Sequence, residues 1–226
     1  MRASLSIARI PDLRSEIAFL QVWDTESVNV QNGWLQDMRA NIHLLQAKPG
    51  FVSMTLHRSL DQKNLCVYAQ WTDQRDLESA LNDAAVQGAR EKLDRWGQPD
   101  GRPYTFHSLI PPRDSSHAVL EICADHAITF VNVWRCDDST RQKQLITAME
   151  EEVEMIASKK GFLGMALHAS LDGAYAGVYA RWQSLSAFRA AVEDNPEARS
   201  GRTRLSAWGK PKANVFSVDG VYLPLS

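Results

Sequence analysis

The stretch GFLGMALHASLDGAYAGVYARW, residues 161–182, decides the fold of this chain. It contains two apolar runs of strand-like composition, joined by a Leu-Asp-Gly turn. The same pattern occurs in residues 50–71 as GFVSMTLHRSLDQKNLCVYAQW, without a gap and at a constant offset, since 168 − 57 and 182 − 71 both give 111. Solenoid repeats have periods of about 20 to 50 residues. The longer period therefore indicates a duplicated domain.

Length and composition agree with two ordinary domains. The chain has 226 residues, 44% hydrophobic and 23% charged, and a formal net charge of −2. Two copies of roughly 110 residues each are within the usual size of a domain. We assign residues 14–111 to an N-terminal domain and 125–226 to a C-terminal domain, with a polar, proline-containing linker at 111–116. The small net charge gives no reason to expect a nucleic-acid partner.

The N-terminal segment lacks the continuous apolar core of a signal peptide, and no apolar run approaches the roughly 20 residues that cross a bilayer. The sequence thus predicts a cytoplasmic protein with no membrane partner. Cysteines occur only at Cys66, Cys123 and Cys136. Their number is odd and their spacing is not that of metal ligands, which favours free thiols in a reducing compartment.

Each copy is predicted to run strand, helix, strand, strand, helix, strand. The first strands are 18–23 and 129–134, rich in β-branched and aromatic residues, and the last are 104–110 and 214–218. The first helix of each copy has an apolar stripe with spacings of 3, 4 and 7. The stripe consists of Trp34, Leu35, Met38, Ile42 and Leu45 in copy one, and of Leu145, Ile146, Met149, Val153 and Ile156 in copy two.

The ends of these helices also have sequence signals. Asn32 in copy one and Asp138-Ser139 in copy two are candidate N-caps, and Gly50 and Gly161 are candidate C-terminal glycines. Asn195-Pro196 should interrupt the second helical segment of copy two, because a residue before proline is disfavoured in the α region. The element order is ferredoxin-like. Its sheet has one face without helices, so we expect an α+β fold in which the two tandem sheets pack face to face inside one chain.

The repeated Gly-Phe to Trp block, with Asn195-Pro196 downstream, resembles the antibiotic biosynthesis monooxygenase family. It looks most like the quinone-forming anthrone oxygenases of aromatic polyketide pathways, which are single-domain homodimers. The likeness covers both copies and is closer in copy two. It implies two tandem ferredoxin-like domains that form an intramolecular dimeric α+β barrel, while further association between whole chains stays open.

The resemblance also implies cofactor-independent oxygenation. A phenolic substrate, deprotonated in the pocket, would itself reduce molecular oxygen, and the resulting peroxide would collapse to a quinone. The protein would supply orientation, a water-poor cavity and stabilisation of the developing anion. The expected partners are thus an aromatic small molecule and oxygen, and no flavin or metal is required.

The residues that line the pocket in this family correspond to particular positions of this sequence. The pocket tryptophan falls on Trp71 and Trp182, and the pocket arginine falls on Arg202 and, less closely, on Arg90. Two departures concern the polar groups that handle protons in such enzymes. Val67 and Val178 stand where an asparagine is typical, and Leu77 and Phe188 stand where a tyrosine is typical.

Further candidates follow from residue chemistry. Gln21 and Asn132 occupy equivalent strand positions and could bind a substrate carbonyl, or could pair with each other between the sheets. His57 and His168 are the histidines that recur, and histidine is a natural base near neutral pH, although a solvent-facing or backbone-bonded role before a turn is the alternative. The predicted catalytic residues are Trp182, His168, Arg202 and Asn132, and the predicted substrate-binding residues are Trp71, Trp34, Phe188, Val178, Met149 and Gln21.

We expect the C-terminal pocket to be the larger and the functional one, because Trp34 adds bulk where copy two has Leu145. Two alternatives to oxygenation remain open. One is a non-oxidative cyclase, isomerase or decarboxylase of natural-product biosynthesis, favoured by the missing asparagine and tyrosine. The other is a binding protein without chemistry, since one fold serves several functions.

Overall fold

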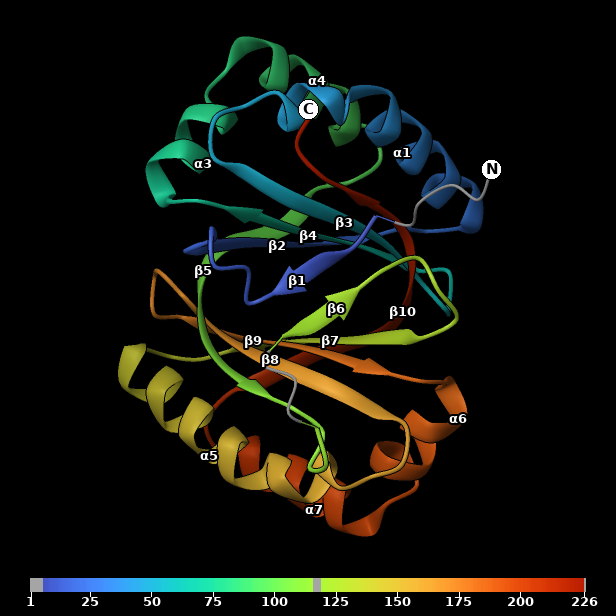
Figure 1. The fold of residues 1–226 in the computed structure, drawn as a ribbon, viewed down its shortest axis with the longest axis vertical. Helices are drawn as coiled ribbons and strands as arrows, with labels where there is room; N and C mark the ends of the chain where they lie inside the picture. The colour runs from blue at the N-terminus through green and yellow to red at the C-terminus, as the bar shows by residue number, and fades with distance from the viewer. Residues whose placement is uncertain (1–5, 116–118, 226) are drawn as a thin grey trace.

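The computed structural model describes residues 6–115 and 119–225. Helices lie on two opposite sides of a layer of strands, with α1, α3 and α4 on one side and α5, α6 and α7 on the other (Figure 1). The strands are β1 (Ala8–Ile10), β2 (Ile17–Asp24), β3 (Phe51–Ser59), β4 (Asn64–Trp71), β5 (Pro99–Ile110), β6 (Leu120–Ile122), β7 (Ile128–Arg135), β8 (Phe162–Ser170), β9 (Tyr175–Trp182) and β10 (Lys210–Tyr222). The helices are α1 (Val28–Asn41), α2 (His43–Gln46), α3 (Gln74–Leu81), α4 (Ala84–Asp94), α5 (Ser139–Ala157), α6 (Leu185–Phe188), a π-helical turn at Arg189–Glu193, and α7 (Pro196–Leu205).

Eight strands form a closed barrel in the order β10-β3-β4-β2-β5-β8-β9-β7. The first half of the chain contributes the adjacent strands β3-β4-β2-β5, and the second half contributes β8-β9-β7-β10 in the same arrangement. All neighbouring strands are antiparallel. This confirms the predicted α+β fold of two ferredoxin-like units in one barrel. The two sheets do not merely stack, because their edges are joined by hydrogen bonds.

Long strands at the two edges make this junction. β5 has 12 residues, which pair first with β2, from Pro99 to Thr105, and then with β8, from Tyr104 to Ile110. β10 has 13 residues and pairs in the same manner with β7 and then β3. Both strands begin earlier than the sequence predicted, at Pro99 and Lys210. Because each edge strand crosses to the other half, neither half completes the barrel alone.

Most helix ends follow the sequence signals. Asp138 caps α5 as predicted, by accepting a hydrogen bond from the Arg141 backbone amide. Asn195-Pro196 interrupts the second helical segment of copy two as predicted, and Asn195 also caps α7, which has Pro196 in its first turn. The predicted cap at Asn32 is wrong, since α1 begins four residues earlier and Ser27 caps it. Gly50 and Gly161 both adopt the left-handed backbone, with φ of 74° and 84°, where a side chain would be strained.

Strand alternation divides the buried residues into three cores. Two cores lie between the outer face of the sheet and the helices of each half, and the third fills the barrel interior. A short ribbon of β1 paired with β6 adds Ile10, Leu120 and Ile122 to the interior core. The ribbon lies between the two layers of barrel strands (Figure 1) and receives a hydrogen bond from Gln70 to the Arg9 carbonyl. The strand β6 of this ribbon belongs to the segment between the two repeats.

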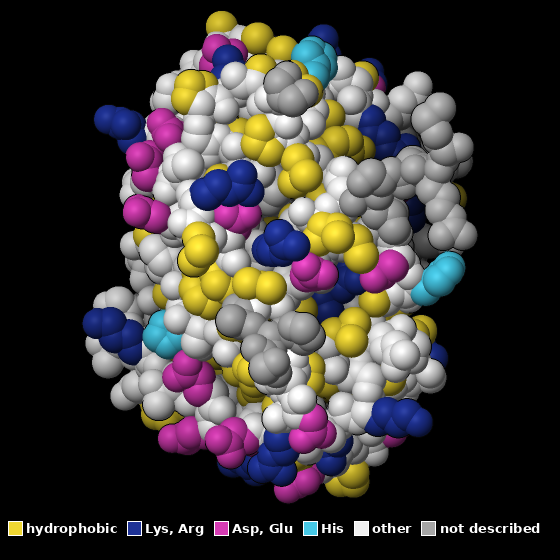
Figure 2. All heavy atoms as spheres, in the orientation of Figure 1, with side chains coloured by type: hydrophobic (Ala, Val, Ile, Leu, Met, Phe, Trp, Pro, Cys, Tyr) yellow, Lys and Arg dark blue, Asp and Glu magenta, His cyan; other side chains and the backbone are white. Residues whose placement is uncertain are grey.

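Charged and hydrophobic side chains are interspersed on the face shown in Figure 2. No helix in the described part of the chain is long and apolar enough to cross a membrane.

Candidate active site

Each half has a pocket between its helices and the outer face of its strands. The pocket walls come from alternate strand residues, because side chains at i and i+2 share one face of a strand. In β2 these are Phe19, Gln21 and Trp23, and the equivalent positions in β7 are Phe130, Asn132 and Trp134. The two pockets are therefore built from the same positions of the repeat.

The C-terminal pocket has a volume of about 90 Å³ and is mainly apolar. Asn132 is only 6% exposed, and its Oδ1 atom has no hydrogen-bond partner within the described residues. The same holds for Nε1 of the neighbouring Trp134. A buried polar atom without a partner costs free energy, about 1 to 3 kcal/mol. An unpaired acceptor and an unpaired donor on one pocket wall are thus available to a ligand.

Arg202 brings a positive charge to this pocket from α7. Across residues 6–115 and 119–225, its guanidinium forms no hydrogen bond or ion pair. The nearby Glu152 carboxylate differs, because it accepts two hydrogen bonds from Arg204, at 2.6 and 2.7 Å. This pairing lowers the pKa of Glu152, which makes it a weak base. The pocket therefore has a free cation and no evident proton acceptor of suitable basicity.

The N-terminal pocket has a volume of about 60 Å³. Trp34 and Trp71 line it together with Gln21, and Arg90 occupies the position equivalent to Arg202. The indole Nε1 atoms of Trp23 and Trp34 have no partner among the described residues. Trp34 lines this pocket at the position that Leu145 has in the second copy, and both the relative size of the two pockets and the choice of the functional one stay predictions.

The structure brings together part of the predicted site. Asn132, Arg202, Val178 and Met149 line the C-terminal pocket, and Gln21, Trp34 and Trp71 line the N-terminal pocket. Neither Gln21 nor Asn132 lies inside the barrel, so the alternative of pairing between the sheets does not apply. Trp182 and Phe188 do not line a pocket. They lie behind its wall, where Phe188 stacks on Phe130 at 5.0 Å and meets Trp182 edge-on at 5.8 Å between ring centroids.

His168 is far from the predicted role. It is 2% exposed and points into the barrel interior, where its Nε2 atom lies 2.9 Å from the Tyr68 hydroxyl. Burial lowers its pKa to about 4, so the imidazole is neutral near pH 7. His168 lies on the inner face of its strand, opposite to the face that carries the pocket residues Met165 and Val178, so it is outside the C-terminal pocket. The solvent-facing alternative is wrong, and the backbone-bonded alternative holds, because His168 bonds to the backbone of Gly177 and Ala166.

Sequence reasoning missed Trp134 and Trp23 as pocket residues. The signal was present, since each follows a predicted pocket residue by two positions on the same strand, at Asn132 and Gln21.

As for a metal, no cluster of three or more His, Cys, Asp or Glu that could hold an ion is found in the described segments.

The fold and pockets define a class of protein: an α+β barrel of two ferredoxin-like halves with a small-molecule pocket under each helical layer. Residues 30–92 match the family model described as antibiotic biosynthesis monooxygenase. The first half of the chain therefore contains a domain of that family, and this similarity supports an enzyme of the monooxygenase class. The match falls on copy one, and copy two repeats the same block and arrangement.

Similar solved structures cover the chain to different extents. The crystal structure of an anthrone oxidase-like protein superposes with a TM-score of 0.79 at 18% identity, over 98% of both chains. A staphylococcal regulator of pathogenesis has a TM-score of 0.51 at 9% identity, over 92% of this chain and 99% of its own, so the fold alone does not specify a function. The Streptomyces coelicolor ActVA-Orf6 monooxygenase, solved with nanaomycin D, is 31% identical over 44% of this chain and 93% of its own, with a TM-score of 0.41. No protein of curated function matched the sequence.

Proposed function

We propose that the protein oxidises an anthrone- or quinol-type aromatic polyketide intermediate to a quinone with molecular oxygen and without a bound cofactor, in the C-terminal pocket. The observation that carries this proposal is the polar pair on the pocket wall. Asn132 Oδ1 and Trp134 Nε1 are buried without partners within the described residues. Together they offer an acceptor for a substrate hydroxyl and a donor for a substrate oxygen, inside an apolar cavity.

Arg202 supplies the electrostatic part of the proposed reaction. Loss of a proton from an anthrone gives an anion with its charge on the oxygen attached to the ring, and the unpaired guanidinium of Arg202 at the solvent-exposed side of the pocket can stabilise that charge. The anion transfers an electron to oxygen, and recombination at the methylene carbon forms a C–O bond. The peroxide then loses water as the remaining C–H bond breaks. The balance is one anthrone and one O₂ to one quinone and one H₂O.

Few protein groups in the pocket could accept the proton of the substrate. Val178 lines the wall where a polar side chain is typical of the family, and Glu152 is held by Arg204. We therefore propose that Arg202 lowers the pKa of the bound substrate enough for solvent to accept its proton. The reaction should then favour acidic, electron-rich phenols and accelerate as pH rises toward the pKa of the bound substrate.

Oxygen uptake by metal-free protein with a model anthrone tests the proposal, with a protein-free reaction as the background. Asn132→Leu and Arg202→Gln should each lower kcat/KM by about tenfold or more, an interaction of at least about 1.4 kcal/mol. Gln21→Leu and Arg90→Gln are the matched changes in the other pocket and should have little effect. No enzyme-dependent uptake across several polycyclic phenols would overturn oxygenation.

The absence of a polar group at Val178 and Phe188 favours one competing function, a cyclase, isomerase or decarboxylase that uses the same pocket. Turnover under strict anaerobiosis separates the two. Product formation without oxygen would support the non-oxidative enzyme, whereas our proposal requires that turnover stops. Retention of the aromatic ligand with no product in either atmosphere would indicate a binding protein.

A further inference from the structure

A second cavity lies at one mouth of the barrel. The ribbon of β1 and β6 lies near the end where β2 and β7 begin, because Gln70 and Arg181 bind the ribbon there. At the other end, where β2 and β7 stop, a cavity of about 270 Å³ is left. Its lining consists of Leu20, Val22, Asp100, Tyr104, Val133, Arg135, Tyr175, Lys210, Pro211 and Lys212. The cavity is separate from the two helical pockets, since it shares no lining residue with them.

The floor of this mouth is apolar. Leu20, Val22 and Val133 belong to the interior core, together with Tyr104 and Tyr175. Val22 and Val133 are only partly buried. For comparison of size, an engineered cavity of about 150 Å³ lined by Leu, Ile and Phe binds benzene. The mouth is thus large enough for one or two aromatic rings.

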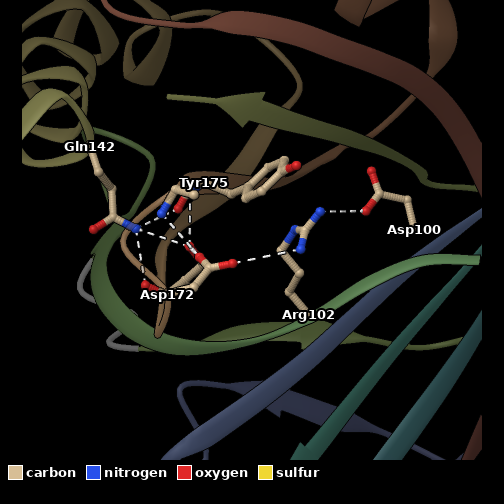
Figure 3. Close-up of polar contacts among 7 residues, drawn as sticks. Asp100, Arg102, Gln142, Asp172 and Tyr175 are labelled. Carbon is tan, nitrogen blue, oxygen red and sulfur yellow. Dashed lines mark hydrogen bonds and ion pairs between the residues drawn. The ribbon is translucent and has the colours of Figure 1, made fainter. Parts of the chain in front are cut away.

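The rim is charged, and most of its charges are paired. Arg102 lies between Asp100 and Asp172, at 3.0 and 3.6 Å, with its guanidinium 3.7 Å from the centre of the Tyr175 ring (Figure 3). Lys212 pairs with Asp24 across the mouth at 2.8 Å. These contacts fix the acidic side of the rim and leave its carboxylates occupied.

Two cations on the rim have no such partner. Arg135 and Lys210 are directly opposed on β7 and β10, so their side chains share the inner face. Neither side chain forms a hydrogen bond or ion pair with any residue that the structure describes. Like charges directly opposite each other on adjacent strands destabilise a sheet. An anion bound between them would relieve this repulsion and form charge-assisted hydrogen bonds.

We propose that the barrel mouth binds an aromatic carboxylate, with the carboxylate between Arg135 and Lys210 and the ring on the apolar floor. This site is independent of the reaction proposed for the C-terminal pocket. A guanidinium and an ammonium can donate together to one carboxylate, and the surrounding side chains of Val22 and Val133 provide the contact for the ring. The ligand enters from solvent, because both cations are exposed.

Titration calorimetry of the full chain with 1-naphthoate and with the uncharged 1-naphthamide tests the proposal. We expect naphthoate to bind at least about tenfold more tightly than the amide, and its affinity to fall as sodium chloride is raised. The double change Arg135→Gln/Lys210→Gln should lower naphthoate affinity by about tenfold or more. The matched double change Lys143→Gln/Lys160→Gln removes the same charge from other exposed sites and should leave it unchanged.

Val133→Trp provides a second variant, which fills the floor without altering the charges and should abolish binding. Arg202→Gln and Asn132→Leu should leave naphthoate binding unchanged, and this separates the barrel mouth from the C-terminal pocket. Two results would overturn the proposal. One is equal affinity for naphthoate and the amide, and the other is a loss of naphthoate affinity in Arg202→Gln but not in Arg135→Gln/Lys210→Gln.

Discussion

Tyr68 and His168 come from different halves of the chain, yet the tyrosine hydroxyl lies 2.9 Å from Nε2 of the histidine. The equivalent residues form the reciprocal contact, with Nε2 of His57 2.7 Å from the Tyr179 hydroxyl. Between these two contacts, the ring centroids of Tyr68 and Tyr179 are 5.0 Å apart. These four buried side chains connect the two repeats through the centre of the barrel, and the two recurring histidines have equivalent contacts in it.

Removing one hydroxyl from this cluster should destabilise the whole protein. Tyr68→Phe leaves Nε2 of His168 buried without its partner, which costs about 1 to 3 kcal/mol of unfolding free energy. Urea unfolding measures the loss. Tyr175→Phe is the control, since the Tyr175 hydroxyl makes no hydrogen bond with residues the structure describes and should cost little. A double-mutant cycle with His168→Phe should give a coupling of about 0.5 kcal/mol or more, and additive losses would contradict a direct interaction.

Acid should destabilise the protein through these histidines. Burial lowers the pKa of His57 to about 3 and that of His168 to about 4, from 6.5. Between about pH 6.5 and 4 the unfolded chain binds protons that the folded protein excludes, so stability present above pH 6.5 is lost as pH falls. The loss is up to about 1.4 kcal/mol per pH unit for each histidine.

Carboxylates whose pKa is lowered in the folded protein also make it less stable as pH falls. A variant is therefore needed to isolate the contribution of the histidines. Unfolding free energies measured from pH 7 to pH 4.5 should fall less steeply in His168→Phe than in the unmodified protein. The same slope in both would show that His168 is not buried in its neutral form.

The two halves should not be stable as separate monomers. A chain cut after Ser115 separates β5 from β8 and β3 from β10, which removes the hydrogen bonds at both junctions of the barrel. The inner face would also expose its apolar core to water. Sedimentation of residues 1–115 and 116–226 should show dimers, aggregates or unfolded chains separately, and a 1:1 complex when mixed. Folded monomers of either half would contradict both the shared barrel and the intramolecular pairing.

Comparison of two tryptophan variants tests which pocket works. Trp182→Phe and Trp71→Phe retain most of the buried apolar area, so each should cost less stability than the roughly 3 to 5 kcal/mol of truncation to alanine. We expect Trp182→Phe to lower activity, because Trp182 supports Phe188 and through it the pocket wall at Phe130. Trp71→Phe should have little effect. The reverse result would move the site to the N-terminal pocket, and equal losses would mean that both are used.

The element order and several of the pocket residues could be predicted from the sequence alone. The 111-residue repeat, the helical stripes and the strand alternation follow from local geometry, which depends on neighbouring residues along the chain. Gln21 and Asn132 could be selected in this way, whereas Trp71 and Arg202 were selected by the resemblance to the monooxygenase family, and each of the four lines a pocket.

Tertiary structure decided which strand face meets the helices. Alternation along β8 and β9 puts His168 and Tyr179 on the opposite face of the sheet from Met165 and Val178. It does not say which of the two faces points into the barrel. His168 was therefore assigned to the wrong face. The extension of β5 and β10 into the other half depends on pairing between residues more than 60 positions apart, such as Tyr104 with Ser170. The barrel-mouth cavity has the same origin, because Arg135 and Lys210 become neighbours only when the sheet closes and pairs their strands.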